Sequence, residues 1–508
     1  MKNTNIILGT LAVSAIAVGS FFFPNQKDSQ GEYSPKAISF KTKDAQSFTL
    51  AQNYYNDLRK NVNTGLIEDA DYINALEHIQ NMSYEKTTSF SFVEEGPDNV
   101  GGRTRAISVH PDNDNYIIAG AITGGLFKTD NGGNSWSRIQ GWDDATELLA
   151  IASTAITNDG TIYVATGGSA FEGDLTYENS GAQRGDGLWY STDNGATFTQ
   201  VSGTNNKDLT KVTADPSKDD LVYISGTSFG AKKMENKGAL VSLTGTSLGQ
   251  STTTQDIKVS PDGTVVLIAS GSTVWSSQDG GSTFNKVTGN STGLISGSSA
   301  RNETSVAYDK NSNGKWNCYV SRSLSNFHIG GVWMSEDNGI TWTRIGQQYT
   351  SNSNGGVTWD PLAAQGYYNM VIDAVKGSPN QCILGGLNLY RWTKSSSTGP
   401  ATGTWETLTN WAFPKGNPNY VHADNHRLTW NSRGQLLVGN DGGIQISQDN
   451  TVNSFYDANR GYNVTQFIKA GIGPDGAGDV ELEAKGKMTV LEIKPKTKVL
   501  KKLGLSAS

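Results

Sequence analysis

Cysteine and positive charge are both scarce in this sequence, and each scarcity excludes a class of protein. Only two cysteines, Cys318 and Cys382, occur among 508 residues, which excludes a disulfide-rich scaffold and a cysteine-based zinc module. Whether these two pair is left open, because spacing alone does not show that their Cα atoms approach closely enough. The net charge of −7 argues against a nucleic-acid partner, which needs a basic surface.

Long hydrophobic runs are also missing, except at the N-terminus. There Lys2 precedes an apolar stretch from Ile6 to Val18, and the small residues Gly19 and Ser20 suit a cleavage point. This pattern predicts a signal peptide over residues 1–24 that engages the export machinery, followed by a linker over 25–44. The protein is therefore expected to be secreted or held on the outer cell surface. An uncleaved anchor is the alternative, because the uncharged run continues through Phe23.

Glycine, in contrast, is abundant, with 59 residues. Helical periodicity occurs only over residues 45–83, where Leu50, Tyr54 and Leu58 recur at helical spacing, so we predict a short amphipathic helical segment there. From residue 88 onward, short β-rich runs alternate with glycine-rich turns. That composition is typical of an all-β protein, because glycine adopts positive φ without steric cost.

A repeat with a spacing of about 45 to 65 residues organises this β-rich part. Seven apolar runs mark the second strand of each unit: 116–120, 162–166, 221–225, 265–269, 318–321, 382–385 and 436–439. One strand precedes each run and two follow it, with the third strand of the third unit placed at 239–241. Seven four-stranded units predict an all-β, seven-bladed β-propeller over residues 88–470. Phe90 to Val93 are expected to help close the ring, and a lysine-rich tail follows over 471–508.

The turn between the third and fourth strands carries a recurring Ser-x-Asp-x-Gly-x-Thr-aromatic motif. Good copies centre on Asp193, Asp279 and Asp337, a copy that we align with one extra residue contains Asp130, and half a copy contains Asp449. The aspartate can accept hydrogen bonds from the N–H groups of the turn, the glycine supplies positive φ, and the aromatic ring packs between sheets. These aspartates are therefore predicted to be structural.

The motif resembles the Asp-box, or BNR-repeat, β-propeller superfamily, which includes sialidases, xyloglucan-active glycosidases and sortilin-type receptors. Three further strings, at 96–105, 422–426 and 439–443, are similar to those of exported Bacteroidetes proteins labelled BNR-repeat or glycosyl-hydrolase-like. The resemblance covers about residues 45–470. Members of that group commonly continue into a second propeller and a sorting domain, whereas this chain departs from their pattern after Phe467. The resemblance also implies that the Asp-box turns lie on the side away from any ligand.

Polar residues gather at loop-proximal positions of the first and seventh units, which become neighbours when the ring closes. We expect a cluster there of Arg103, Arg105, His422, Asp424 and Asp441. His426 is a further candidate, because His422, Asp424 and His426 alternate and are expected to share one face of the seventh inner strand. Three interpretations remain open: a hydrogen-bonded lock between blades, a ligand site for a polar or acidic group, and a metal site formed by the two histidines and Asp424. No cofactor is otherwise predicted, and a structural calcium or zinc ion stays open.

Aromatic residues crowd the same loops, and Trp142, Tyr367 and Tyr420 are the candidates for a ligand platform. Such rings suit the apolar faces of sugars, and they suit plain loop packing equally. The string Asp309–Gly314 matches the first half of a calcium-binding loop. Its twelfth position is Val320 instead of glutamate, so a turn before a strand is the preferred interpretation.

Two functions from different classes are consistent with these patterns. Glycoside hydrolysis needs two opposed carboxylates. The resemblance places one of them in the first blade, where this chain has Ile122, and no sialidase-type arginine triad is visible. We therefore favour a surface module, acting as a monomer, that binds an extracellular glycan or a cell-surface protein. The alternative is a sialidase- or xyloglucanase-like glycoside hydrolase.

Overall fold

A computed structural model describes residues 98–465 apart from 147, 169–184, 244–247, 249–252, 296, 298, 351–358 and 397–398. It also describes Asn74, His78 and three strands within 467–493. The chain divides into two units, Met1–Ser83 and Tyr84–Ser508. In the first unit Asn74 and His78 are both helical, and the predicted signal peptide and linker lie outside the described residues. Among the described residues, no helix is long and apolar enough to cross a membrane.

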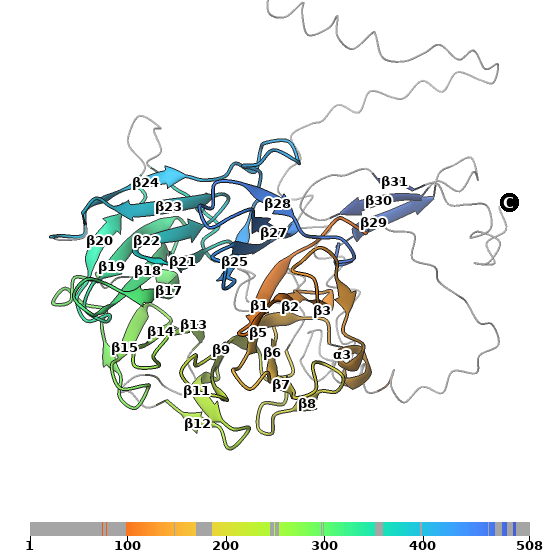
Figure 1. Cartoon of the computed structure of the whole chain (residues 1–508), viewed down its shortest axis with the longest axis horizontal. Coiled ribbons are helices and arrows are strands. Elements are labelled where there is room, and N and C mark those ends of the chain that lie inside the picture. The colour runs from red at the N-terminus through yellow and green to blue at the C-terminus, as the bar shows by residue number, and fades with distance from the viewer. Residues whose placement is uncertain are drawn as a thin grey trace, which may run out of the picture. The chain divides into compact units, whose positions relative to one another are not determined.

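The second unit contains seven four-stranded antiparallel sheets that are arranged around a common axis as the blades of a β-propeller (Figure 1). This confirms the predicted fold class. The first four sheets comprise β1 (Thr104–His110), β2 (Asn113–Ala121), β3 (Gly125–Thr129), β4 (Ser137–Arg138); β5 (Ile151–Ile156), β6 (Ile162–Thr166), β7 (Leu188–Ser191), β8 (Thr199–Gln200); β9 (Leu209–Ala214), β10 (Leu221–Gly226), β11 (Gly230–Glu235), β12 (Val241–Ser242); and β13 (Thr254–Val259), β14 (Val266–Ser270), β15 (Thr273–Ser277), β16 (Asn285–Lys286).

The remaining three sheets continue the same order. They comprise β17 (Ser299–Lys310), β18 (Trp316–Leu324), β19 (Ile329–Ser335), β20 (Thr343–Gly346); β21 (Val371–Val375), β22 (Ser378–Gly385), β23 (Leu389–Lys394), β24 (Gly403–Thr407); and β25 (Asn425–Trp430), β26 (Leu436–Asn440), β27 (Gly443–Ser447), β28 (Phe455–Asp457). A separate three-stranded sheet follows, with β29 (Phe467–Ile472), β30 (Val480–Ala484) and β31 (Leu491–Ile493), so the predicted tail contains strands.

The strand order fixes which connections share a side of the ring. Each sheet runs in sequence from its innermost to its outermost strand, and neighbouring strands are antiparallel. The connections that lead into each innermost strand therefore lie on the same side as the turns between second and third strands. We call this side the upper face, and the opposite side, with the turns between third and fourth strands, the lower face.

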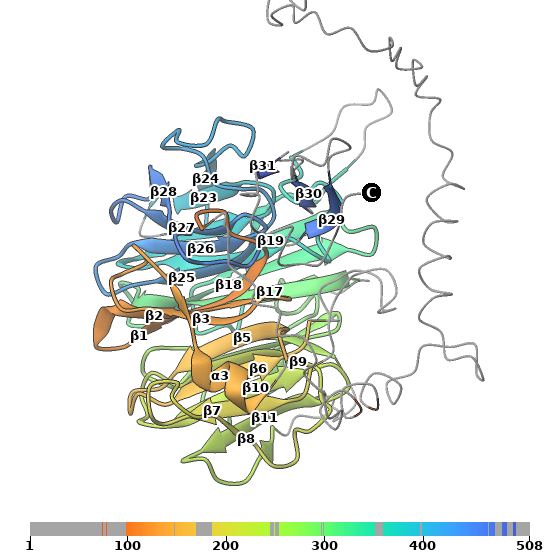
Figure 2. The same cartoon turned by 90° about the vertical axis from the view of Figure 1, so that its right-hand side faces the viewer.

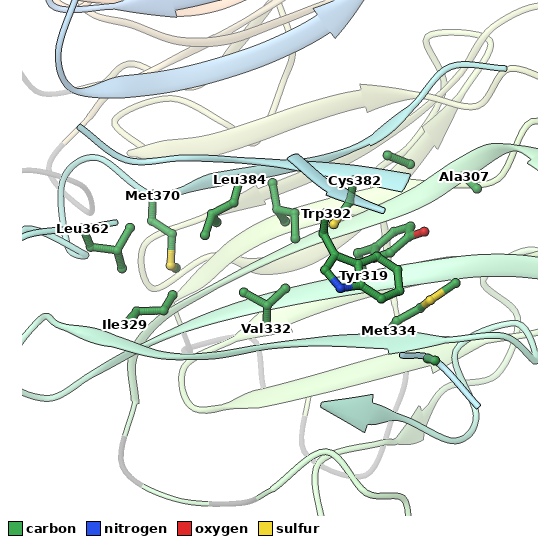
Figure 3. Packing of buried hydrophobic residues seen from close by; sticks show 13 residues of the cluster. Ala307, Tyr319, Ile329, Val332, Met334, Leu362, Met370, Cys382, Leu384 and Trp392 are labelled. Atoms are coloured by element: carbon green, nitrogen blue, oxygen red, sulfur yellow. The ribbon is translucent and has the colours of Figure 1, made fainter. Parts of the chain in front are cut away.

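Apolar side chains hold neighbouring blades together. Between the fifth and sixth blades a buried cluster includes Tyr319, Met334, Cys382, Leu384 and Trp392, whose side chains interleave between the two sheets (Figure 3). Similar clusters lie at other junctions between blades. Because a sheet whose two faces are both covered must be apolar on both, the second strands appear in the sequence as continuous apolar runs instead of alternating patterns.

The ring closes between the first and seventh blades through the segment that follows β28. Trp136 donates its indole N–H to the Ala458 carbonyl at 2.7 Å, and Thr465 donates to the Val100 carbonyl at 2.7 Å. A side chain on Gly102 would overlap the Val464 carbonyl, so this close approach requires glycine. The predicted contribution of Phe90 to Val93 to ring closure lies outside the described residues.

One strand prediction is wrong. The third strand of the third blade is β11, not residues 239–241, which fall at the edge strand β12. Strand β11 has the sequence GAKKME, whose two lysines hide the apolar pattern; Lys232 lies over the Phe229 ring at 4.7 Å. A long side chain of this kind can cover apolar surface while its charge stays in water.

Candidate functional site

The carboxylate of Asp441 is the centre of a polar cluster on the upper face. Asp441 lies in the turn between β26 and β27, and it accepts hydrogen bonds from Arg103 Nε at 3.2 Å and His426 Nε2 at 2.8 Å. The Tyr368 hydroxyl approaches both carboxylate oxygens, at 2.7 and 2.6 Å. These partners come from the first, sixth and seventh blades, so the cluster spans the point of ring closure.

Tyr368 ties the arginines to this cluster. The guanidinium carbons of Arg103 and Arg105 lie 4.7 and 5.5 Å from the centre of its ring, close enough for cation–π attraction. Its backbone carbonyl accepts hydrogen bonds from Arg105 at 3.5 Å and from Arg301 at 3.2 Å. Arg301 in turn pairs with Glu303 at 2.7 Å. Three buried arginines are thus arranged around one tyrosine.

Burial and neighbouring charges set the protonation states in the cluster. Burial, reinforced by the positive charge of Arg105, lowers the pKa of His426 to about 3, so the ring is neutral; its Nε2 faces Asp441 and its Nδ1 faces the Tyr368 carbonyl. Burial alone would raise the pKa of Asp441, but the hydrogen bond from His426 and the charge of Arg103 hold that pKa well below its usual range. The carboxylate of Asp441 is therefore surrounded by the guanidinium groups of Arg103 and Arg105 and by a neutral imidazole.

Asp424 lies beside this cluster but has a different partner. It precedes β25 in a left-handed conformation, with φ of 65°, and it accepts a hydrogen bond from the Asn369 amide at 2.9 Å. Burial and the nearby Asp441 raise its pKa. The prediction that His422, Asp424 and His426 share one face of the seventh inner strand is wrong, because β25 begins only at Asn425.

The metal interpretation of that trio finds no support. His426 is turned toward Asp441, whereas the His422 ring packs over Gly442, where any side chain would overlap it. Within the part of the chain that the structure describes, no three His, Cys, Asp or Glu side chains could hold a metal ion. Asn311, in the string that resembles a calcium-binding loop, accepts the N–H groups of Asn313 and Lys315, which makes the string a turn between two strands.

Two of the three predicted aromatic platform residues are buried. Helix α3 (Gln140–Ala145) follows β4 (Figure 2). Its Trp142 is fully buried and packs edge-on against Trp189 and Phe198 of the second blade. A single turn of helix after β4 carries this ring inward, which the loop pattern did not indicate. Tyr420 is only 8% exposed. Tyr367 is half-buried and packs against the Phe327 ring at 4.8 Å.

Exposed aromatics do occur on the upper face, in the connection between β24 and β25. Trp411 and Phe413 are 41% and 39% exposed. Their backbone is held in place, because Trp411 N–H donates to Asn388 Oδ1 at 2.8 Å and Phe413 N–H donates to the Asn410 carbonyl at 3.1 Å. The two rings are therefore presented to solvent by a hydrogen-bonded loop.

The Asp-box turns on the lower face have the hydrogen bonds that the motif predicts. In the second blade, Asp193 accepts the N–H of Thr197 at 2.9 Å and its hydroxyl at 2.6 Å, while Ser191 accepts the N–H of Gly195 at 2.9 Å. The turns at Asp279 and Asp337 repeat these contacts. At the half motif, Asp449 accepts the N–H and hydroxyl of Thr451.

Asp130 does not belong to the set. In the first blade Asn131 occupies the aspartate position, since its side-chain oxygen accepts the Thr129 hydroxyl at 2.7 Å and the Ser135 N–H at 3.0 Å. The turn therefore has the same length as the others, without the extra residue that the sequence alignment placed there. Asparagine offers the same acceptor as aspartate, which explains the substitution.

Sequence reasoning missed several residues of the upper face. Arg301 and Asn369 join the cluster from the fifth and sixth blades, and no motif marks either. A second pair was also missed: His328 Nδ1 lies 2.6 Å from Asp360 Oδ2, and its ring stacks on Tyr349 at 3.7 Å. The only available signal is positional, because Asn369 lies shortly before its innermost strand and Arg301 near the start of its own, the position that singled out Arg103.

Comparison with known proteins shows a likeness of fold. No family model matches the chain, and no curated protein matches it in sequence. A GH74 xyloglucanase from Xanthomonas campestris superimposes with a TM-score of 0.52 at 15% identity, covering 78% of this chain and 59% of that one. An ancestral GH74 enzyme gives 0.52 at 14% identity, covering 78% and 51%. The chain thus spans between half and three fifths of the length of these enzymes, and at such identities they resemble it in the propeller fold alone.

Proposed function

We propose that this chain is a carbohydrate-binding propeller that acts outside the cell and binds an extracellular glycan through its upper face. The observation that carries the proposal is the pair of exposed rings, Trp411 and Phe413, on a hydrogen-bonded loop. Aromatic rings held at the surface suit the apolar faces of sugar rings. Beside β25 on the same face, half-buried Asp424 accepts one hydrogen bond from Asn369 and retains acceptor capacity for a sugar hydroxyl.

Binding is favoured over hydrolysis by the state of Asp441. Its carboxylate already accepts hydrogen bonds from Arg103, Tyr368 and His426, and its low pKa makes it a poor proton acceptor. Hydrolysis remains the second candidate because Asp424 has a raised pKa, which suits a general acid, and because the fold is similar to that of GH74 enzymes.

The test is a glycan array on the purified chain, followed by affinity and hydrolysis measurements on each glycan that binds. Replacing both Trp411 and Phe413 by alanine should weaken binding at least tenfold, as expected for the loss of about 1.4 kcal/mol or more of stacking. Tyr456→Ala is the matched control, because that ring is 37% exposed but lies on the outermost strand β28. Unchanged affinity in the double variant would overturn the assignment of the face.

Hydrolysis of a bound glycan would favour the second candidate function, a glycoside hydrolase, over a binding protein. In that case Asp424→Asn should abolish turnover while the glycan still binds. If no glycan on the array binds, carbohydrate recognition is wrong, and a cell-surface protein becomes the ligand to seek.

A further inference from the structure

Ionisable side chains also gather on the innermost strands, away from Asp441. We define the axial cluster as Lys211 of β9, Asp256 and Lys258 of β13, Glu303 of β17, Asp373 of β21 and Arg427 of β25. Asp256, Arg427, Glu303 and Lys258 all act on the pKa of Lys211, which burial lowers overall, and Asp373 lies 3.5 Å from Lys258. Five of the seven blades thus contribute to one charged region around the axis.

Each carboxylate of the axial cluster has a cation as its partner. Asp256 lies 2.9 Å from Lys211, Asp373 lies 3.5 Å from Lys258, and Glu303 lies 2.7 Å from Arg301. Hydroxyl and backbone N–H groups donate further hydrogen bonds to these carboxylates. Thr304 donates its N–H and hydroxyl to Asp256, and Tyr308 donates its hydroxyl to Asp373 at 2.8 Å. The negative charges are therefore already neutralised.

Arg427 is the cation of the axial cluster that takes part in none of these ion pairs. Its Nε is buried and has no hydrogen-bond partner among the described residues, and none of the three carboxylates forms an ion pair with it. A guanidinium group in this position is costly unless an anion or water compensates it. Solvent does reach the region, because the side chains of Lys211 and Lys258 are 12% and 16% exposed and Arg427 is only half-buried.

We propose that the axial cluster binds a small oxyanion, with Arg427 as the principal donor, because the ion pairs of the other charged groups leave the positive charge of Arg427 uncompensated. A planar guanidinium fork matches the oxygen atoms of phosphate, sulfate or a carboxylate in a bidentate manner. The site is independent of the aromatic loop of the proposed carbohydrate face. Two sources share this chemistry: a free inorganic anion, and the carboxylate of an acidic sugar.

Calorimetric titration of the full chain with sodium phosphate and, separately, with glucuronate tests the proposal. Arg427→Gln should weaken binding roughly tenfold or more, since a hydrogen bond to a charged group is lost. Arg427→Lys keeps the charge and should retain part of the affinity. Arg433→Gln is the matched control: Arg433 lies in the turn after the same strand, is 57% exposed and pairs with Asp114 at 3.4 Å.

A second readout separates specific binding from the general stabilisation that phosphate confers on folded proteins. In buffer of low anion content, Arg427→Gln should melt at a higher temperature than the wild type, because an uncompensated charge is removed. Millimolar phosphate should then raise the melting temperature of the wild type and of Arg433→Gln, but not of Arg427→Gln. Binding of phosphate alone would indicate a free anion, and binding of both probes a carboxylate. No binding of either probe, or equal binding by Arg427→Gln and Arg433→Gln, would overturn the proposal.

Discussion

The carboxylate of Asp441 should be the main electrostatic support of ring closure, and Asp441→Asn removes its charge with little change of shape. The side chain is 11% exposed and neutralises Arg103, itself 7% exposed, while it also accepts Tyr368 and His426. After the substitution, buried arginines face a neutral amide. Breaking a buried pair from one side costs about 3–5 kcal/mol. We expect a loss of unfolding free energy of that size.

Asp424→Asn is the control variant for this prediction. The two carboxylates are neighbours, but Asp424 accepts only an amide hydrogen bond among the described residues, and burial already disfavours its charge. The new side-chain carbonyl can still accept from Asn369, so the unfolding free energy should change by less than about 1 kcal/mol. If ring closure instead depended on any nearby negative charge, both variants would lose stability.

Urea denaturation followed by tryptophan fluorescence measures both variants under the same conditions. Tyr368→Phe, alone and combined with Asp441→Asn, completes a double-mutant cycle that isolates the hydroxyl–carboxylate contact. The coupling should be about 1.5–3 kcal/mol, as for hydrogen bonds to charged groups. The reasoning fails if Asp441→Asn costs less than about 1 kcal/mol, or if Asp424→Asn costs as much.

Three further measurements test other parts of the structure. Asp337→Ala should lower the unfolding free energy by about 1 kcal/mol in a denaturant titration, because turn N–H groups lose their acceptor, and should leave glycan affinity unchanged. Because the pKa of His426 is depressed to about 3, only the unfolded chain gains this proton between pH 6.5 and 4. Stability should therefore fall as pH falls through that range, more steeply in wild type than in His426→Asn. Cys318 and Cys382 are buried, with raised thiol pKa values, so neither should react with a thiol reagent until urea unfolds the protein.

The sequence predicted the propeller because its physical demands recur in every blade. A buried second strand must be apolar on both faces, and a tight turn needs an acceptor and a glycine, so both leave a signal at each repeat. The exceptions are instructive. Strand β11 was missed because its lysines hide its apolar pattern, and Asp130 was chosen because aspartate is the usual acceptor, although Asn131 fills the position.

The candidate site was predictable only in part. Ring closure makes the first and seventh blades neighbours, which is why the sequence alone predicts that Arg103 and Asp441 lie together. Tyr368 and Arg301 come from the sixth and fifth blades, and their contacts with the neighbouring blades depend on loop shape that no periodicity encodes. The prediction that Trp142 is a platform residue is wrong for the same reason, because one turn of helix decides whether an aromatic ring in a loop faces solvent or the interior.

The two faces of the ring differ in a way that explains this contrast. On the lower face the same tight turn is stabilised in several blades, so its residues are alike from blade to blade and the motif is easy to see. A ligand contacts a propeller at one place, so residues that serve it occur once and break the repeat. Asp424, with its φ of 65°, and the exposed pair Trp411 and Phe413 are non-repeating features of this kind, and all three lie on the upper face. In a repeat protein of this type, departures from the repeat are therefore better guides to function than the repeat itself.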